Sequence, residues 1–375
     1  MDIKPFKVEE WINAHERTAK YNISSTGVVN LTLDGLLELT GTDREAFLEE
    51  LCSRRLSYGH IGGSPELLQG ICGLYRTLRP VDVVPTHGAA GANHHVFYTL
   101  IEPGDRVVSI VPTYQQLYSI PEGYGADVKW LKLRKEDSFQ PDLDELERLA
   151  APGTKMICII NPNNPCGSVI SNEALRRVVD IARAAGAWLL CDESYRHLTQ
   201  NGEWIDSVAD LYEKGISTSS TSKVFSMPGL RMGWIACRDH DFVASCLSHR
   251  DYNLVSCGNL DDTIAALALK HAGTLIERGQ NVIRNNLQVV EDWVQSEPHI
   301  SWVKPQGGSI TLLYYDFDMN SYDFCQKLFD RTGVFVSPGD CFEMPGSFRL
   351  GYAGNTAEYL KAGLDAISRF MKTLE

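Results

Sequence analysis

The feature that most constrains the fold is an alternation of short apolar runs with a well-delimited helical segment in the middle of the chain. Three apolar runs bounded by polar or turn residues are typical of buried strands: Arg106–Val111, Met156–Ile160 and Ala187–Cys191. Between the last two, Asn172–Ala185 has apolar residues at helical spacing, with Ser171 as a potential cap and Gly186 after its end. This order predicts an α/β fold with a mostly parallel central sheet flanked by helices.

The carboxy-terminal part has a different pattern. A strand is expected over Ser309–Tyr315, a turn at 337–339, and an amphipathic helix over Ala357–Lys372. These segments predict a smaller α+β domain, and 375 residues are enough for both parts. The expected division is a large domain at 46–275 and a small domain made of 1–45 and 276–375.

Composition limits the partners and the compartment. The net charge of −13 argues against a general affinity for nucleic acid or for an anionic membrane. The 10 cysteines show no CxxC pair or zinc-ligand spacing, so reduced thiols and no metal site are expected. The amino terminus lacks the apolar core of a secretory signal, and no stretch is long enough to span a bilayer. We therefore expect a cytoplasmic protein.

Lys223 is the first candidate for chemistry. A cofactor that carries both a carbonyl group and a phosphate needs an amine for an imine, and hydroxyls and a cation for the phosphate. Around Lys223, the residues Ser220, Ser222 and Arg231 supply these groups. The alternative is a structural loop with a satisfied arginine, because most lysines are solvated surface residues.

Asp192 and Tyr195 follow the strand predicted to end at Cys191. In parallel sheets the ligand lies beyond the carboxyl ends of the strands, so this is where chemistry is expected. A buried carboxylate needs a cationic partner, and a protonated pyridine nitrogen is such a partner. Tyr195 could donate a hydrogen bond to the phenolic oxygen of the same ring. The alternative is that Asp192 caps a helix.

Three further segments supply candidate binding residues, because they follow predicted strands or contain small residues. The two Asn-Pro steps of residues 161–165 fix the direction of Asn164. Backbone N–H groups of the small-residue segment Gly88-Ala89-Ala90 can approach an anion at the start of a helix, although the segment matches neither a Walker loop nor GxGxxG. Tyr114 could stack on a planar cofactor, and ordinary packing is an equal alternative.

Taken in this order, the segments resemble the fold-type I, aspartate-aminotransferase-like superfamily of pyridoxal-phosphate enzymes from about Tyr58 to Arg349. The resemblance implies that Lys223 forms the Schiff base with pyridoxal 5'-phosphate and shuttles the proton at the substrate α-carbon. It implies a set of residues around the ring and the phosphate: Gly88, Ala89, Ala90, Tyr114, Asn164, Asp192, Tyr195, Ser220, Ser222 and Arg231. Arg349 corresponds to the arginine that binds the α-carboxylate of an amino-acid substrate, for which a planar guanidinium is suited.

The resemblance also implies a homodimer with a shared active site, because Tyr58 corresponds to the tyrosine that reaches the phosphate of the neighbouring subunit. Some positions depart from the usual pattern. Ala90 and Gly91 stand where a hydroxyl and an acid or amide are common, and Cys166 replaces the threonine of the Asn-Pro-Thr-Gly turn. Neither change removes an obligatory group, and both suggest a divergent branch.

The reaction is left open by fold and cofactor. An aminotransferase is the first expectation because transamination is the commonest outcome in this lineage. The alternative is a cyclase that dehydrates a hydroxyarginine and closes its guanidine ring, because four segments resemble the capreomycidine-synthase group and related enduracididine-forming cyclases: 21–28, 86–88, 114–118 and 139–145. Such an enzyme should have acidic or aromatic groups in the distal pocket. A third alternative, a non-catalytic relative, is disfavoured by the presence of Lys223, Asp192 and Arg349.

Overall fold

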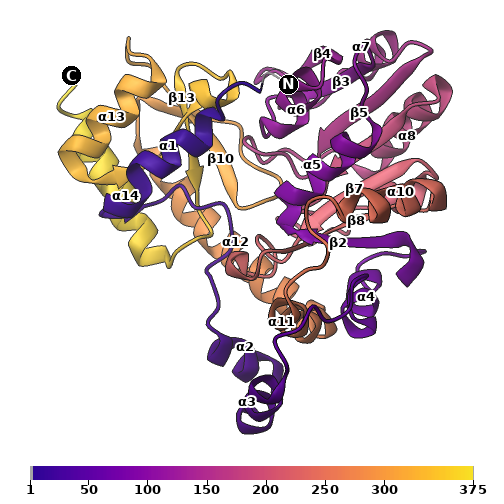
Figure 1. Cartoon of the computed structure of the whole chain (residues 1–375). Coiled ribbons are helices and arrows are strands. Elements are labelled where there is room, and N and C mark those ends of the chain that lie inside the picture. The colour runs from indigo at the N-terminus through magenta and orange to yellow at the C-terminus, as the bar shows by residue number, and fades with distance from the viewer. Residues whose placement is uncertain (1–2, 375) are drawn as a thin grey trace.

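A seven-stranded sheet forms the larger part of the computed structural model, which describes residues 3–374 (Figure 1). Its strands are β2 (Val83–His87), β3 (Arg106–Val111), β4 (Asp127–Lys132), β5 (Thr154–Ile160), β6 (Trp188–Asp192), β7 (Gly215–Ser220) and β8 (Met232–Ala236). They lie in the order β2-β8-β7-β6-β5-β3-β4, with β8 antiparallel to both neighbours and every other pair parallel. The predicted mostly parallel sheet is confirmed.

Both faces of this sheet are buried at its central strands, which explains why β3, β5 and β6 are largely apolar without alternation. Along β5, Ile157 and Ile159 pack in one cluster with α8 (Asn172–Ala185), while Cys158 and Ile160 pack in another with α5 (Gly88–Leu100). The α8 helix has the predicted bounds. Its Ser171 side chain accepts a hydrogen bond from the N–H of Ala174, and Gly186 ends the helix in the left-handed conformation at φ 70°.

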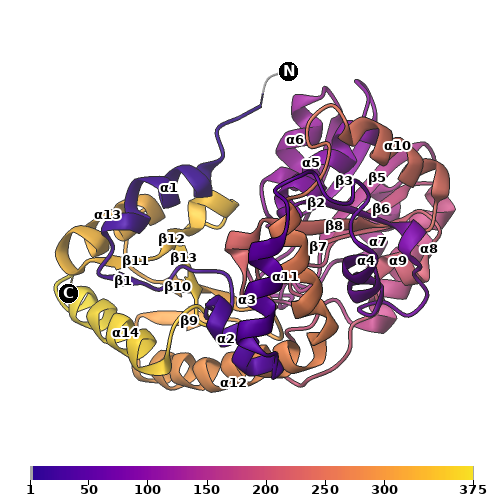
Figure 2. The same ribbon diagram turned by 60° about the horizontal axis from the view of Figure 1, so that its bottom comes forward.

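The remaining helices of this part cover the two faces and the edge of the sheet (Figures 1 and 2). They are α4 (Pro65–Cys72), α6 (Gln116–Gly123), α7 (Leu143–Leu149), α9 (Val208–Leu211), α10 (His240–Arg250) and α11 (Asn259–Lys270), with the 3₁₀ turns η2 (Pro80–Asp82) and η3 (Pro228–Leu230). No helix begins at Asp192, because the next one, α9, starts at Val208. The alternative that Asp192 is a helix cap is therefore wrong.

A smaller antiparallel sheet is built from the carboxy-terminal residues. Its order is β12-β13-β10-β9, with β9 at Ile300–Trp302, β10 at Ile310–Tyr315, β12 at Ser337–Pro338 and β13 at Ser347–Gly351. The turn predicted at 337–339 is wrong in part, because Ser337 and Pro338 pair with β13 as an edge strand before η4 (Gly339–Phe342). An edge position tolerates proline because the missing N–H faces away from the sheet.

Helices complete this smaller part on both sides of its sheet (Figure 2). The long α12 (Ala272–Ser296) leads into it from the larger part, and α13 (Ser321–Thr332) and α14 (Ala357–Met371) pack against each other. The final helix agrees with the prediction to within one residue. The domain boundaries expected at residues 46 and 275 stay predictions.

The amino-terminal segment crosses from the smaller part toward the larger one (Figure 1). After α1 (Lys7–His15) and η1 (Glu16–Thr18), β1 (Tyr21–Asn22) pairs in parallel with β11 (Val334–Phe335). The chain then passes Lys223, where the N–H of Val28 donates to the Lys223 carbonyl at 3.1 Å. Two helices follow and extend away from both parts: α2 (Leu33–Thr40) and α3 (Arg44–Ser53).

The described part of the chain, residues 3–374, contains no helix with the length and apolar character needed to cross a membrane. All ten cysteines have free thiols, and eight of them are buried. Among the same residues, no group of histidine, cysteine and carboxylate side chains is arranged to hold a metal ion.

Candidate active site

A cavity of about 200 Å³ opens at the carboxyl ends of β5, β6 and β7. Its lining brings together most of the residues predicted from the sequence: Ala89, Ala90, Tyr114, Asn164, Asp192, Tyr195, Ser220, Ser222, Lys223, Arg231 and Arg349. Segments that are far apart in the sequence meet here because parallel strands end at the same edge of the sheet.

Lys223 follows β7 by three residues, and its side chain reaches the cavity. Its Nζ donates a hydrogen bond to Oγ1 of Thr26, on the segment that follows β1. Burial and, to a smaller extent, the positive charge of Arg349 lower the pKa of Lys223 to about 8, although the carboxylates of Glu9 and Asp192 oppose the shift. A larger fraction of this amine is therefore neutral near pH 7 than for an ordinary lysine.

Asp192 ends β6, and its carboxylate is held from two sides. Oδ2 accepts a hydrogen bond from Nδ2 of Asn93 on α5 at 2.9 Å, and Oδ1 accepts from the N–H of Ser194 at 3.0 Å. The Asn93 side chain is itself fixed by Thr218 on β7, whose hydroxyl donates to Oδ1 of Asn93 at 2.6 Å. This buried carboxylate has a set direction at the wall of the cavity.

Arg349 lies on β13 of the smaller sheet and is 2% exposed. Its Nη1 donates to Oδ1 of Asn164 at 3.1 Å, and its Nη2 lies 3.4 Å from Oγ of Ser337. Within residues 3–374, no hydrogen-bond partner meets Nε of Arg349, although this atom is buried. A buried guanidinium with an unpaired N–H beside a cavity is suited to bind a carboxylate there.

The start of α5 has the features of an anion site. His87 provides no side-chain cap, so the first N–H groups of the helix, from Gly88 onward, have no intrahelical or capping partner. A Cβ added to Gly233 on β8 would lie 2.3 Å from the carbonyl carbon of Gly88, so only glycine lets the helix start this close to the sheet.

Arg231 lies against this helix start. A Cβ on Gly88 would come within 2.7 Å of Nη2 of Arg231. Arg231 itself has a left-handed backbone with φ 49°, which is unfavourable for a non-glycine residue and is typical of functional positions. Ser220 and Ser222 line the same end of the cavity. The hydroxyls, the guanidinium and the free N–H groups together form a site that fits a phosphate.

The aromatic and acidic walls of the cavity come from different segments. Tyr114 follows β3 by three residues, and its hydroxyl donates to Oε1 of Glu9 at 2.8 Å. Burial and the adjacent Glu9 carboxylate raise the pKa of Tyr114 well above its usual range. Burial raises the pKa of Tyr195 to about 12, with Arg349 opposing the shift. Both phenols therefore keep their protons over the physiological range and can donate hydrogen bonds.

Tyr58 is the one predicted side chain that lies away from this cavity. It is 71% exposed and borders a second cavity between α3, α4 and α11. Gly88 lies next to the cavity through its neighbours Ala89 and Ala90.

Some polar side chains at the site were not predicted from the sequence: Glu9 and Thr26 line the cavity, and Asn93 holds the Asp192 carboxylate. Thr26 lies within the segment 21–28 that resembles the cyclase group. That resemblance could have indicated that this segment contributes to the site. Asn93 lies one helical turn after Gly88-Ala89-Ala90, which a helical projection of α5 could have indicated. Nothing local marks Glu9, because it reaches the cavity only through the docking of α1.

This cavity, at the carboxyl edge of a mostly parallel sheet, is lined by the groups that a phosphorylated, planar cofactor would need. Residues 29–367 match the family model described as aminotransferase class I and II. The chain belongs to this family. The predicted fold and enzyme class are thereby confirmed, and the family membership implies pyridoxal phosphate as the cofactor, as predicted.

Individual relatives include both reaction types. Capreomycidine synthase of Streptomyces vinaceus is 31% identical, over 98% of this chain and 93% of that protein. The crystal structure of a PLP-dependent aminotransferase from Streptococcus suis has a TM-score of 0.96 and 40% identity, and covers 100% of this chain and 99% of that one. The PLP-dependent cyclase OrfR has a TM-score of 0.92 and 26% identity, with 100% and 98% coverage.

Proposed function

We propose that this protein catalyses a pyridoxal-phosphate-dependent reaction at the α-carbon of an amino acid, with Lys223 Nζ as the atom that attaches the cofactor and moves the α-proton. The observation that carries the proposal is the meeting of Lys223, Asp192 and Arg349 around one cavity. When bound, pyridoxal phosphate supplies an aldehyde that combines with amines and a ring that accepts electrons from the α-carbon.

The residues divide between the two ends of that cofactor. Asp192 would hold the pyridine nitrogen, and Tyr195 and the Asn164 amide nitrogen would donate to the phenolic oxygen. Tyr114 would stack on the ring. The phosphate would bind at the start of α5, Gly88 to Ala90, together with Ser220, Ser222 and Arg231. These positions are supported by the uncapped helix start and by the fixed direction of the Asp192 carboxylate.

Arg349 would bind the α-carboxylate of the substrate, which supports an amino-acid substrate. The contact between Arg349 and Asn164 joins the substrate end of the cavity to the cofactor end. Lys223, with its lowered pKa, would then lie beside the α-carbon as a neutral base, and Thr26 would orient its amine through the hydrogen bond to Nζ.

The other charged groups near the substrate end favour a cationic side chain. An adjoining hollow of about 490 Å³ is bordered by Glu9 and Glu16 as well as by Lys223 and Arg349. Among the described residues of these two cavities, the cations are Lys223, Arg231 and Arg349, each with a proposed role. Within one chain, the carboxylates of Glu9 and Glu16 remain to bind a cationic side chain such as that of arginine. No fourth cation remains among these residues to bind the second carboxylate of an acidic substrate.

Transamination is the first candidate reaction, because the chain belongs to the aminotransferase family. Dehydration and ring closure of a hydroxyarginine is the second candidate. It is favoured by Glu9 and Glu16 at the substrate end, and by the 31% identity to capreomycidine synthase over nearly its whole length.

One experiment separates these candidates. The purified enzyme with pyridoxal phosphate is incubated with arginine, aspartate or hydroxyarginine, each with and without 2-oxoglutarate, and the products are identified by mass. Conversion of 2-oxoglutarate to glutamate with arginine as the amino donor supports the aminotransferase. Loss of water from hydroxyarginine without a keto acid supports the cyclase. Aspartate as the preferred substrate would contradict the proposed cationic side chain.

We also propose that the protein is a homodimer in which Tyr58 reaches the partner's site. Large apolar side chains are exposed on two adjacent segments: Leu56, Tyr58, Ile61, Tyr252 and Val255. The segments are joined by a hydrogen bond of 3.3 Å from the Ser256 hydroxyl to the Tyr58 carbonyl. An exposed apolar patch of this kind favours a protein interface. Sedimentation of wild type and Tyr58→Ala tests the dimer, and the cofactor affinity of the variant tests the shared site.

A further inference from the structure

A buried ion pair lies directly behind the turn that carries Asp192 and Tyr195. Nε of Arg196 is 2.9 Å from Oε2 of Glu193, and neither side chain is more than 3% exposed. Successive residues of an extended strand point to opposite sides, so Asp192 faces the cavity and Glu193 faces the interior behind it. The turn at residues 192–196 thus presents Asp192 to the cavity on one side, and on the other side it is held by the buried Glu193–Arg196 pair.

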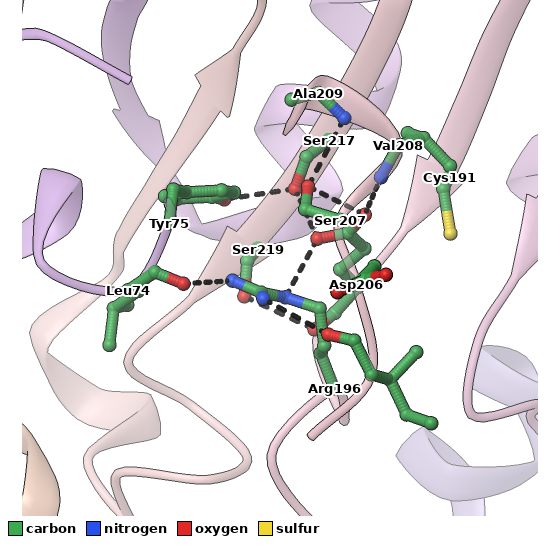
Figure 3. A network of polar contacts seen from close by, with 12 residues as sticks. Leu74, Tyr75, Cys191, Arg196, Asp206, Ser207, Val208, Ala209, Ser217 and Ser219 are labelled. Carbon is green, nitrogen blue, oxygen red and sulfur yellow. Dashed lines mark hydrogen bonds and ion pairs between the residues drawn. The ribbon is translucent and has the colours of Figure 1, made fainter. Parts of the chain in front are cut away.

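The Glu193 carboxylate accepts three hydrogen bonds in addition to the ion pair with Arg196. Oε1 accepts from the Ser207 hydroxyl and from the N–H of Val208, both at 2.9 Å. Oε2, the oxygen paired with Arg196, accepts from the Ser217 hydroxyl at 2.8 Å. These donors come from β7 and from the start of α9, so the carboxylate is fixed relative to the sheet (Figure 3).

The Arg196 guanidinium is fixed as well. Nη2 donates to the carbonyl of Leu74 at 2.6 Å, and Nη1 lies 3.4 Å from the carbonyl of Ile205. The guanidinium carbon lies 4.7 Å from the centre of the Tyr75 ring, which is a favourable cation–π contact. Figure 3 shows the Arg196 side chain reaching the carbonyl of Leu74, with Ser207, Val208 and Ser217 of the network above it in this view.

The same network extends toward the proposed phosphate end. The Ser217 hydroxyl lies 2.9 Å from the hydroxyl of Tyr75, which accepts a hydrogen bond of 2.8 Å from Nε1 of Trp234. Trp234 lies on β8 next to Gly233, the residue that lets α5 start against the sheet. A continuous set of buried contacts therefore joins the turn at 192–196 to the strand beneath the helix start.

We propose that Glu193 and Arg196 are positioning residues that hold Asp192 and Tyr195 at the distances the cofactor ring requires. The inference rests on the proposed function. The backbone supports it, since the N–H of Glu193 donates to the carbonyl of Thr218 at 2.8 Å and the N–H of Arg196 donates to the carbonyl of Glu193 at 2.9 Å. A change at the ion pair would shift Asp192 and Tyr195 together, whereas a change at a buried charge away from the cavity, such as Asp206, would affect stability alone.

The test compares Glu193→Gln with Asp206→Asn in the enzyme loaded with pyridoxal phosphate. Asp206 is a matched control, because its carboxylate is 4% exposed and paired with Arg176 at 2.7 Å and Arg76 at 3.0 Å, yet it does not border the cavity. Both variants should have a lower Tm. Only Glu193→Gln should lower kcat, by about tenfold to a hundredfold, because small displacements of positioned groups are costly.

Two further readouts distinguish positioning from stability. Titration of the visible absorbance of the bound cofactor should have a more alkaline midpoint in Glu193→Gln, because a displaced Tyr195 disperses less of the charge on the ring oxygen. The dissociation constant of the cofactor should rise in the same variant. In Asp206→Asn, both quantities should equal those of wild type.

An unchanged titration midpoint and cofactor affinity in a folded Glu193→Gln would overturn the inference. If that variant does not fold, Ser217→Ala removes one donor without leaving a charge unpaired, and it should show the same alkaline shift at smaller size; no shift in Ser217→Ala would also overturn the inference. A wild-type protein that gains no visible absorbance with pyridoxal phosphate would overturn the proposed function itself, and the positioning role with it.

Discussion

The two ends of the cavity are built in different ways. The cofactor end consists of strand ends and one helix start within a single sheet, from Gly88 to Arg231. The substrate end is assembled from both ends of the chain, with Glu9 and Thr26 from the amino-terminal segment and Arg349 from the small sheet. In the proposed function, attachment of the cofactor therefore depends on one sheet and its strand ends, whereas substrate choice depends on how two distant segments dock onto that sheet.

The largest effect is expected at the cofactor end. Lys223→Ala removes the amine that attaches the cofactor and moves the α-proton, so turnover should fall by more than about a thousandfold. Cofactor should still bind through the phosphate site, but without the absorbance of the lysine-attached form. Activity assays and absorbance spectra measure both. Lys214→Ala, at a half-buried turn position just before β7 and away from the cavity, is the control. Retained turnover in Lys223→Ala would disprove the assignment.

A smaller loss is expected from Asp192→Asn, which keeps the shape and removes the charge proposed to face the pyridine nitrogen. We expect kcat to fall by about a hundredfold to a thousandfold, as for loss of one preorganised electrostatic contact. The KM for the amino acid should change little, because Arg349 and the substrate end are untouched. Steady-state kinetics test this split, with Glu147→Gln in an exposed ion pair as the control. A variant in which only KM changes would contradict the assignment of Asp192 to the cofactor end of the cavity.

A substitution at the substrate end should instead change KM and leave the cofactor end unaffected. Glu9→Gln should raise the KM for arginine by about tenfold, the value expected for loss of one charged hydrogen bond, and leave cofactor affinity unchanged. Glu10→Gln is a matched control, because Glu10 is the exposed neighbour on the same helix. Equal effects of Glu9→Gln on arginine and on an uncharged amino acid would show that Glu9 does not recognise a cationic side chain.

The smallest expected effect links the two ends through the pKa of Lys223, which is about 8. Below that pH the amine becomes protonated, so the rate at which pyridoxal phosphate attaches to the cofactor-free protein should fall as the pH is lowered. Arg349 lowers this pKa and Glu9 raises it. Arg349→Met should therefore move the midpoint to higher pH and Glu9→Gln to lower pH, each by less than about one unit. Shifts in the same direction would contradict the electrostatic coupling.

The sequence was most informative where local chemistry and periodicity coincide. The bounds of α8 and β3, and the position of Asp192 at the carboxyl end of a strand, follow from apolar runs, caps and the rule for parallel sheets. The prediction was poorer in the small part, where Pro338 is an edge-strand residue and not part of a turn. A proline signals both environments, and only the pairing with β13 distinguishes them.

The sequence by itself determined three strands and one helix of the large sheet, the residues that follow those strands, and the family to which they point. The tertiary structure decided which distant groups meet, such as Glu9 with Tyr114 and Arg349 with Asn164. It also decided that Glu193 and Arg196 lie behind the cofactor turn as a buried pair. The physical reason is that local propensities depend on neighbours in the chain, whereas burial, pKa shifts and ion pairing depend on neighbours in space.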